Sequence, residues 1–165
     1  MSIVISGQYL AFVHAIETQG YTVILTKRNL NLLSPEQLHA DMQLLKVQDK
    51  IFTLDSCCRT VKSEYPYNVL LNGLYLGSKF YGKISAIDDT VLRYCRAQGI
   101  ELVDVRQGYT RCSTLTVTNN AVITADSSIE RVMKQNGVEV LRITNGHIRL
   151  DGVLITDLSA AVRQD

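Results

Sequence analysis

Four polar side chains stand at positions from which they could carry out chemistry, because each lies at the entry of a segment predicted to form a β-hairpin. They are His39, Asp41, Asn68 and Cys112. A thiol can act as a nucleophile, an imidazole can carry a proton, and a carboxylate or an amide can hold a polar ligand. The residues are far apart in the sequence, so they can share a site only if a repeated fold brings equivalent positions together.

A repeated fold is indicated by three stretches that share one plan. Each has an amphipathic segment, a Gln-Gly or Asn-Gly break, and a short β-branched run. The breaks place Gly20, Gly99 and Gly137 where a left-handed residue commonly ends a helix. The β-branched runs that follow are predicted strands, at residues 21–26, 100–105 and 138–143.

Each predicted strand is followed by a predicted hairpin, so the repeating unit is helix, strand, hairpin. The hairpins pair residues 42–47 with 51–55, 112–118 with 121–125, and 148–150 with 153–156. A further hairpin, 69–76 with 79–85, is preceded by only a remnant of the helix and first strand. A series of aspartates supports the repeat, because each stands where a carboxylate would cap a helix: Asp55, Asp88, Asp126 and Asp157.

Composition places these units in one compact domain. The chain has 165 residues, 46% of them hydrophobic, which is enough to form one core. We expect a single α/β domain over residues 1–165 with about four units, of which the one near 56–85 is degenerate and the tail at 153–165 is divergent.

Charge and apolar runs exclude several classes of partner. Seventeen basic and sixteen acidic residues give a near-neutral chain without a basic stripe, which argues against nucleic acid. No apolar run approaches the roughly 20 residues of a membrane span. The first residues lack the pattern of a secretion signal, and four cysteines without C-x-x-C spacing are typical of reduced thiols in a cytoplasm. No phosphate loop or zinc-ligand spacing appears, so neither a cofactor nor a metal is predicted.

Four short motifs occur in a specific order. They are His-x-Asp-Met-Gln at 39–43, Tyr-Pro-Tyr-Asn at 65–68, Gln-Gly-Tyr-x-x-Cys-Ser at 107–113 and Ile-Thr-x-Asp at 123–126. Together they resemble an uncharacterised bacterial family, seen largely in Clostridia-type Firmicutes, that is assigned to the guanidino-group-modifying-enzyme (pentein) fold. The resemblance extends over about residues 8 to 152.

The resemblance implies a five-bladed α/β propeller, in which each blade is a small sheet backed by a helix. This chain departs from it in two places. The second helix is missing around 57–63, and the last blade after Gly152 is replaced by an unrelated tail. An incomplete propeller leaves sheet edges exposed, so we expect either an open assembly or a homo-oligomer in which a second chain covers the gap.

The resemblance also implies a chemistry. Enzymes of this fold attack a guanidinium carbon with a Cys thiolate, and the corresponding roles here are Cys112 as nucleophile and His39 as acid and base. Asp41 and Asn68 would hold the substrate, and Tyr67 and Arg111 would also belong to the substrate-binding set. Arg111 would lower the pKa of the neighbouring thiol. His39 and Asp41 would share one face of an extended strand because they are two residues apart.

Plainer interpretations stay open at each position. Cys112 could be a small buried hydrophobic residue, and His39 with Asp41 could belong to a surface turn after Pro35. Tyr67 has a conformational explanation, because the residues around a proline are held extended. The chain as a whole is either a Cys-dependent hydrolase or deiminase acting on guanidino C–N bonds, or a non-catalytic binding or assembly module, or a degenerate remnant of such an enzyme.

Overall fold

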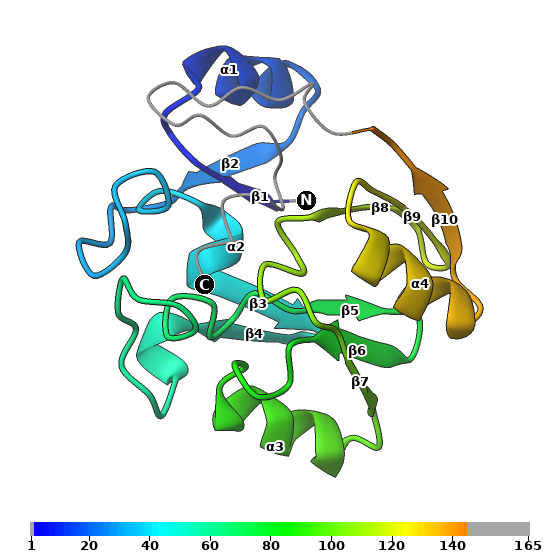
Figure 1. The fold of residues 1–165 in the computed structure, drawn as a ribbon. Helices are drawn as coiled ribbons and strands as arrows, with labels where there is room; N and C mark the ends of the chain where they lie inside the picture. The colour runs from blue at the N-terminus through cyan, green and yellow to red at the C-terminus, as the bar shows by residue number, and fades with distance from the viewer. Residues whose placement is uncertain (1, 145–165) are drawn as a thin grey trace.

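A computed structural model describes residues 2–144, which form a mixed α/β fold (Figure 1). Ten short strands are grouped into four small sheets, and none of the sheets in this part of the chain closes into a barrel. The three longer helices lie at the periphery of the molecule, and most of the strands lie nearer its middle, with β10 at the outer edge (Figure 1). Within residues 2–144, no helix has both the length and the apolar character that crossing a membrane requires.

Two of the sheets are built from complete hairpin–helix–strand units. In each, an antiparallel hairpin is followed by a helix and then by a strand that lies parallel to the second hairpin strand. The first unit consists of β5 (Leu74–Leu76), β6 (Lys79–Gly82), α3 (Asp89–Ala97) and β7 (Glu101–Asp104). The second consists of β8 (Thr114–Thr118), β9 (Ala121–Thr124), α4 (Ser127–Gln135) and β10 (Glu139–Arg142).

The other two sheets contain only part of this unit. One pairs β1 with β2 in parallel around a helix, and the other is a bare antiparallel hairpin, β3 with β4. Their elements are β1 (Ser2–Ile5), α1 (Leu10–Thr18), β2 (Thr22–Leu25), α2 (Ala40–Gln43), β3 (Leu44–Val47) and β4 (Lys50–Thr53). After the short 3₁₀ turn η1 (Leu54–Ser56), residues 57–73 contain neither helix nor strand, in agreement with the helix predicted to be missing there.

The local signals in the sequence correspond to real helix ends. The predicted terminal glycines Gly20, Gly99 and Gly137 have φ values of 82°, 66° and 79°, in the left-handed region that a residue without Cβ adopts at no steric cost. Asp88 and Asp126 cap α3 and α4, because their carboxylates accept backbone N–H groups from the first turn.

Two predictions about this repeat need correction. Asp55 does not cap a helix, since it lies inside η1. The two complete units also begin at a different element, because the strands after α3 and α4 pair with the preceding hairpins, as β7 does with β6 and β10 with β9. The hairpin predicted at 148–156, the divergent tail and Asp157 lie outside the described residues.

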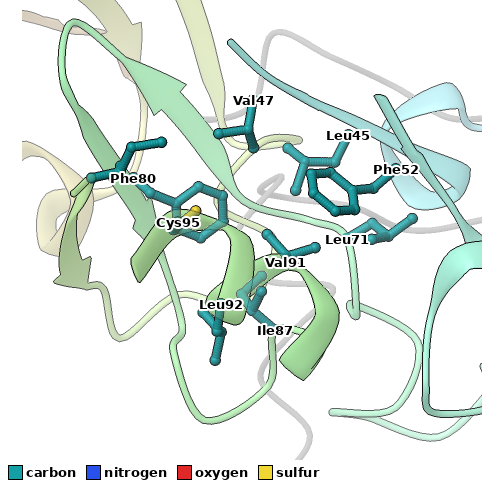
Figure 2. Close-up of a cluster of buried hydrophobic side chains, with 10 residues drawn as sticks. Leu45, Val47, Phe52, Leu71, Phe80, Ile87, Val91, Leu92 and Cys95 are labelled. Atoms are coloured by element: carbon teal, nitrogen blue, oxygen red, sulfur yellow. The ribbon is translucent and has the colours of Figure 1, made fainter. Parts of the chain in front are cut away.

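The largest core cluster ties the bare β3–β4 hairpin to the neighbouring complete unit. Figure 2 shows side chains from β3, β4, β6 and α3 meeting in one place. Phe52 and Phe80 are at most 2% exposed, and burial of each such ring stabilises the fold by roughly 1.5–3 kcal/mol. The helix α1 differs, because none of its residues is buried. The predicted site has a buried cluster of its own, in which Cys112 packs against residues that include Met42, Val69 and Leu70.

Candidate functional site

The structure brings together three of the four residues singled out in the sequence. One ligand atom each from His39, Asp41 and Cys112 lies within 4.8 Å of the other two, and all three residues are half-buried. About 70 residues separate the His39–Asp41 pair from Cys112 in the chain. This convergence agrees with the expectation that the repeat places pre-hairpin positions at a common point.

The conformation that places His39 and Asp41 on the same side is not the expected extended strand. His39 is extended, with φ −71° and ψ 123°, and it is the residue from which the short helix α2 begins. Asp41 lies in the first turn of α2. The prediction of period-two alignment in a strand was therefore wrong, and the two side chains meet because the chain changes from extended to helical between them.

Cys112 lies on a tight turn that leads into β8. The N–H of Ser113 donates to the carbonyl of Tyr109 at 3.0 Å, and that of Thr114 donates to the carbonyl of Arg111 at 3.2 Å. This turn is attached to the rest of the site through Asn72. The Asn72 Oδ1 atom accepts the N–H groups of Arg111 and Cys112, at 2.8 and 3.2 Å.

The other end of the same amide reaches Asp41 and the thiol. Asn72 Nδ2 donates to the Asp41 carbonyl at 3.2 Å and lies 2.9 Å from Cys112 Sγ. Asn72 is 0% exposed, so its hydrogen bonds are made in a site from which water is excluded. The hydrogen bonds of the Asn72 side chain therefore fix the Cys112 turn relative to α2.

Asn72 was missed in the sequence, and the regularity that marks it is visible only once the strand starts are known. Met42, Asn72 and Cys112 each stand two residues before the first strand of a hairpin, namely β3, β5 and β8. Equal offsets mark equivalent positions in a repeat, and these three side chains meet. Asn72 Nδ2 lies 3.1 Å from Met42 Sδ, which in turn lies 3.9 Å from Cys112 Sγ.

Asn68 belongs to a neighbouring polar network and not to the cluster itself. Its Nδ2 donates to the Glu36 carboxylate at 3.2 Å and contacts the hydroxyl of Tyr109, which donates to Glu36 Oε1 at 2.7 Å. Asn68 is 1% exposed, and its Oδ1 has no protein partner within residues 2–144. Tyr67 is 43% exposed, and the Lys62 ammonium lies 5.3 Å from the centre of its ring.

Two aromatic rings approach each other closely beside this network. Tyr65 stacks on Tyr109 with ring centres 6.3 Å apart. A Cβ on Gly108 would come within 2.6 Å of the Tyr65 ring, so any larger residue would require this ring to move. The φ of Gly108 is not positive, so space and not backbone conformation favours glycine at this position.

The electrostatics of the cluster favour a protonated thiol. Burial raises the pKa of Cys112 well above its ordinary value, and the charge of Asp41, which accepts from the thiol, raises it further; the Asn72 amide acts in the opposite direction. The expectation that Arg111 lowers this pKa was therefore wrong. The guanidinium of Arg111 donates to the Thr114 carbonyl at 3.3 Å.

A cavity of about 430 Å³ adjoins the cluster, with Asp41 and Arg111 in its wall. Four sheets contribute to its lining, through Val4 of β1, Lys46 of β3, Tyr75 of β5 and Thr116 of β8. The first strands of the three hairpins and β1 thus surround one space, and a small ligand in that space would reach the Asp41 side of the cluster.

The arrangement suits two kinds of chemistry. A thiol beside an imidazole and a carboxylate is the set needed for nucleophilic attack with proton transfer, once the thiol has lost its proton. The same three groups are also ligands of borderline and soft metal ions.

Comparison with known proteins gives one match. A family model described as "Family of unknown function (DUF6873)" matches residues 46–155, which is two thirds of the chain. The matched stretch contains Asn72 and Cys112, and it begins after His39 and Asp41. No curated protein and no solved structure matches the chain.

Proposed function

Because the chain belongs to this family of unknown function, we propose a role from its own site: binding of a small guanidino compound, with Cys112 as the nucleophile in hydrolysis of a C–N bond. The observation that carries the proposal is the convergence of His39, Asp41 and Cys112 within 4.8 Å. It supports a Cys-dependent hydrolase or deiminase of the kind that the sequence motifs suggested.

The charges around the cavity suit a ligand with a cation at one end and an anion at the other. A guanidinium presents a planar row of N–H groups that pairs well with a carboxylate, here Asp41. Arg111 and Lys46 lie in the wall of the same cavity and offer partners for a ligand carboxylate. We therefore propose an amino acid with a guanidino side chain as the substrate class.

The reaction can be written with each proton accounted for. The Cys112 proton passes to His39 as sulfur forms a bond to the guanidinium carbon. The leaving nitrogen then departs as an amine or ammonia with the proton returned by His39. Water attacks the resulting cationic thiouronium carbon and gives one proton to His39. The C–S bond then breaks, His39 returns that proton to the Cys112 sulfur, and the second water proton leaves the new carbonyl oxygen for the solvent. The products are a ureido compound and the restored thiol, so the reaction needs water and no other co-reactant.

A second candidate, binding without turnover, is favoured by a specific feature. The Cys112 thiol is enclosed and donates a hydrogen bond to Asp41, so it keeps its proton and is unreactive in the free protein. In that case the site recognises the ligand, and the protein serves as a binding or assembly module.

The fold proposal follows the same observations. We propose an incomplete pentein-like α/β propeller, supported by four inner strands around one cavity and by helices at the periphery (Figure 1). A homo-oligomer would cover its open side, because Leu10 and Phe12 on α1 are 70% and 63% exposed. Light scattering at micromolar concentration that gives only the monomer mass would count against the oligomer.

The test of the activity is direct. Purified protein is incubated with arginine, agmatine and methylated arginines, and ureido product and ammonia are measured, with binding followed by calorimetry. Turnover that disappears in Cys112→Ser and persists in Cys58→Ser supports the hydrolase. Binding that needs Asp41 but yields no product supports the second candidate. Neither binding nor turnover with any of these compounds would overturn both.

A further inference from the structure

We propose that His39, Asp41 and Cys112 form a binding site for a zinc-like divalent cation. The inference shares its residues with the proposed function but does not depend on it, because metal binding requires no guanidino ligand. It rests on the identity of the three donors, on the distances between them and on the way in which Asn72 fixes the backbone beside two of them.

The three donors are the types that zinc uses in proteins. A Cys sulfur, a His nitrogen and an Asp oxygen all bind this ion, and three protein ligands plus one open position is the arrangement of exchangeable and catalytic zinc sites. Sulfur and imidazole donors also select against Mg²⁺ and Ca²⁺, which prefer oxygen alone. The site therefore favours Zn²⁺ and its spectroscopic substitute Co²⁺ over Mg²⁺ and Ca²⁺.

The distances are close to those that a tetrahedral ion needs. Zinc bonds of 2.0–2.3 Å place neighbouring ligand atoms about 3.5 Å apart. The ligand atoms of His39, Asp41 and Cys112 all lie within 4.8 Å of one another, so a contraction of no more than about 1.3 Å would complete the set. Rotation of the His39 and Asp41 side chains can supply a movement of this size, because both residues are only half-buried.

The backbone beside two of the three donors is held in place before an ion arrives. The Asn72 amide bridges the backbone N–H of Cys112 and the backbone carbonyl of Asp41, at 3.2 Å to each, and it is fully buried. Its Nδ2 also lies 2.9 Å from Cys112 Sγ. A backbone that is already fixed beside two donors lowers the reorganisation needed for binding, which resembles the role of an outer-sphere residue.

A second thiol–carboxylate pair in the same protein provides a natural control. Cys58 Sγ lies 3.4 Å from Asp88 Oδ1, as close as a ligand pair would be. No histidine joins the pair in a cluster of three or more ligand residues within residues 2–144, and the Asp88 carboxylate already accepts the N–H groups of Cys58, Arg59 and Thr90. This pair should not bind the ion specifically.

The overlap of the two cation sites has a functional consequence. A divalent ion and a guanidinium both need the Asp41 carboxylate, so occupation by one excludes the other. Bound zinc would therefore act as a competitive inhibitor of any guanidino ligand, and release of the ion would restore the site.

The experiment is a titration of the chelator-treated, full-length protein with Co²⁺ alone. The expected result is one ion per chain with a thiolate-to-cobalt absorption band in the near ultraviolet. Cys112→Ser should abolish the band, and Cys58→Ser should leave it unchanged. By calorimetry with Zn²⁺, His39→Ala and Asp41→Asn should each weaken binding by at least about tenfold, as removal of a ligand does.

Three outcomes would overturn the inference: absence of the band in the wild-type protein, persistence of the band in Cys112→Ser, or its loss in Cys58→Ser. Circular dichroism of each variant shows whether it has folded, and Asp41→Asn replaces Cys112→Ser if the latter does not. Failure here is separate from failure of the proposed function. Cobalt binding without arginine turnover leaves the metal site standing alone, and turnover without cobalt binding removes only the metal site.

Discussion

Two thiol–carboxylate pairs of nearly the same composition occupy different places in this protein. Cys58 lies beside Asp88, and Cys112 lies beside Asp41. From the residue types alone, either pair is a candidate for chemistry. The structure separates them by what else the carboxylate contacts.

The carboxylate of Asp88 is hydrogen-bonded mainly to backbone N–H groups. It caps α3 through the N–H of Thr90 at 2.9 Å, and it accepts the N–H groups of Cys58 and Arg59 at 3.1 and 3.0 Å. The Arg59 guanidinium lies 3.6 Å away. Although burial alone would raise its pKa, these donors outweigh it and lower the pKa of Asp88 to about 2. The Asp88 carboxylate therefore stabilises the fold through these contacts.

Asp41 faces side chains that can exchange protons. Within the described residues, no backbone N–H donates to its carboxylate, which instead accepts from the Cys112 thiol and lies near His39. The comparison teaches that a carboxylate satisfied by backbone N–H groups is structural, whereas one that meets titratable side chains is available to a ligand. The predictions that follow test this difference through the free energy of unfolding.

The largest effect is expected from Asp88→Ala. The substitution removes the cap of α3, leaves two further backbone N–H groups without an acceptor and takes the partner from Arg59. We expect a loss of roughly 3–5 kcal/mol in the free energy of unfolding, as for other broken buried pairs. Urea denaturation measures it, with Asp89→Ala as the control, because Asp89 is exposed in the same first turn. A loss below 1 kcal/mol would show that Asp88 is not structural.

The next largest effect is expected from Asn72→Ala. The change leaves the buried N–H groups of Arg111 and Cys112 without their acceptor, and each such group costs roughly 1–3 kcal/mol. We expect a loss of about 2–4 kcal/mol on urea denaturation. Exposed Asn119 is the matched control, and its change to Ala should have little effect. If the two variants were equally stable, the Asn72 side chain would not fix the Cys112 turn relative to α2.

Lowering the pH should reduce the contribution of Asp88 to the free energy of unfolding over a defined pH range. The pKa of Asp88 is about 2 in the folded protein, against an ordinary value of 3.8, so its contribution is present above about pH 4. The contribution is lost as the pH falls toward 2, and it amounts to about 2 kcal/mol. Asp126, whose pKa is also lowered by N–H groups and hydroxyls despite its burial, acts in the same direction. Denaturation at pH 5 and pH 2.5 measures the loss, which should be smaller in Asp88→Asn.

The sequence was informative where a residue acts locally. Gly20 and Gly99 end helices because positive φ is a property of one residue, and Asp126 caps a helix through neighbours two and three positions on. Pairing of β7 with β6 was not predictable in the same way, because it depends on which sheet edge is free after the helix crosses. The local conformation of a residue can thus be predicted from the sequence, whereas the sheet edge that a strand joins cannot.

The candidate site could likewise be predicted only in part. The approach of Cys112 to His39 and Asp41 followed from their shared place before a hairpin. The helical conformation of Asp41 did not, since the four residues of α2 are too few to show a helical period. Asn72 was overlooked in favour of Asn68 because no residue count from the sequence fixed where β5 begins.

The smallest effect on stability is expected from Asp41→Asn, and it bears most closely on the difference between the two pairs. The substitution keeps the shape of the side chain, leaves the Asp41 carbonyl bonded to Asn72, and removes a charge that no backbone N–H within residues 2–144 stabilises. We therefore expect the free energy of unfolding to change by no more than about 1 kcal/mol. The affinity for Zn²⁺ should nevertheless fall by about tenfold or more. Asp88→Asn should show the opposite behaviour, with a clear loss of stability and unchanged zinc affinity. If Asp41→Asn were instead as destabilising as Asp88→Asn, the carboxylate of Asp41 would be structural too, and the distinction between the two pairs would fail.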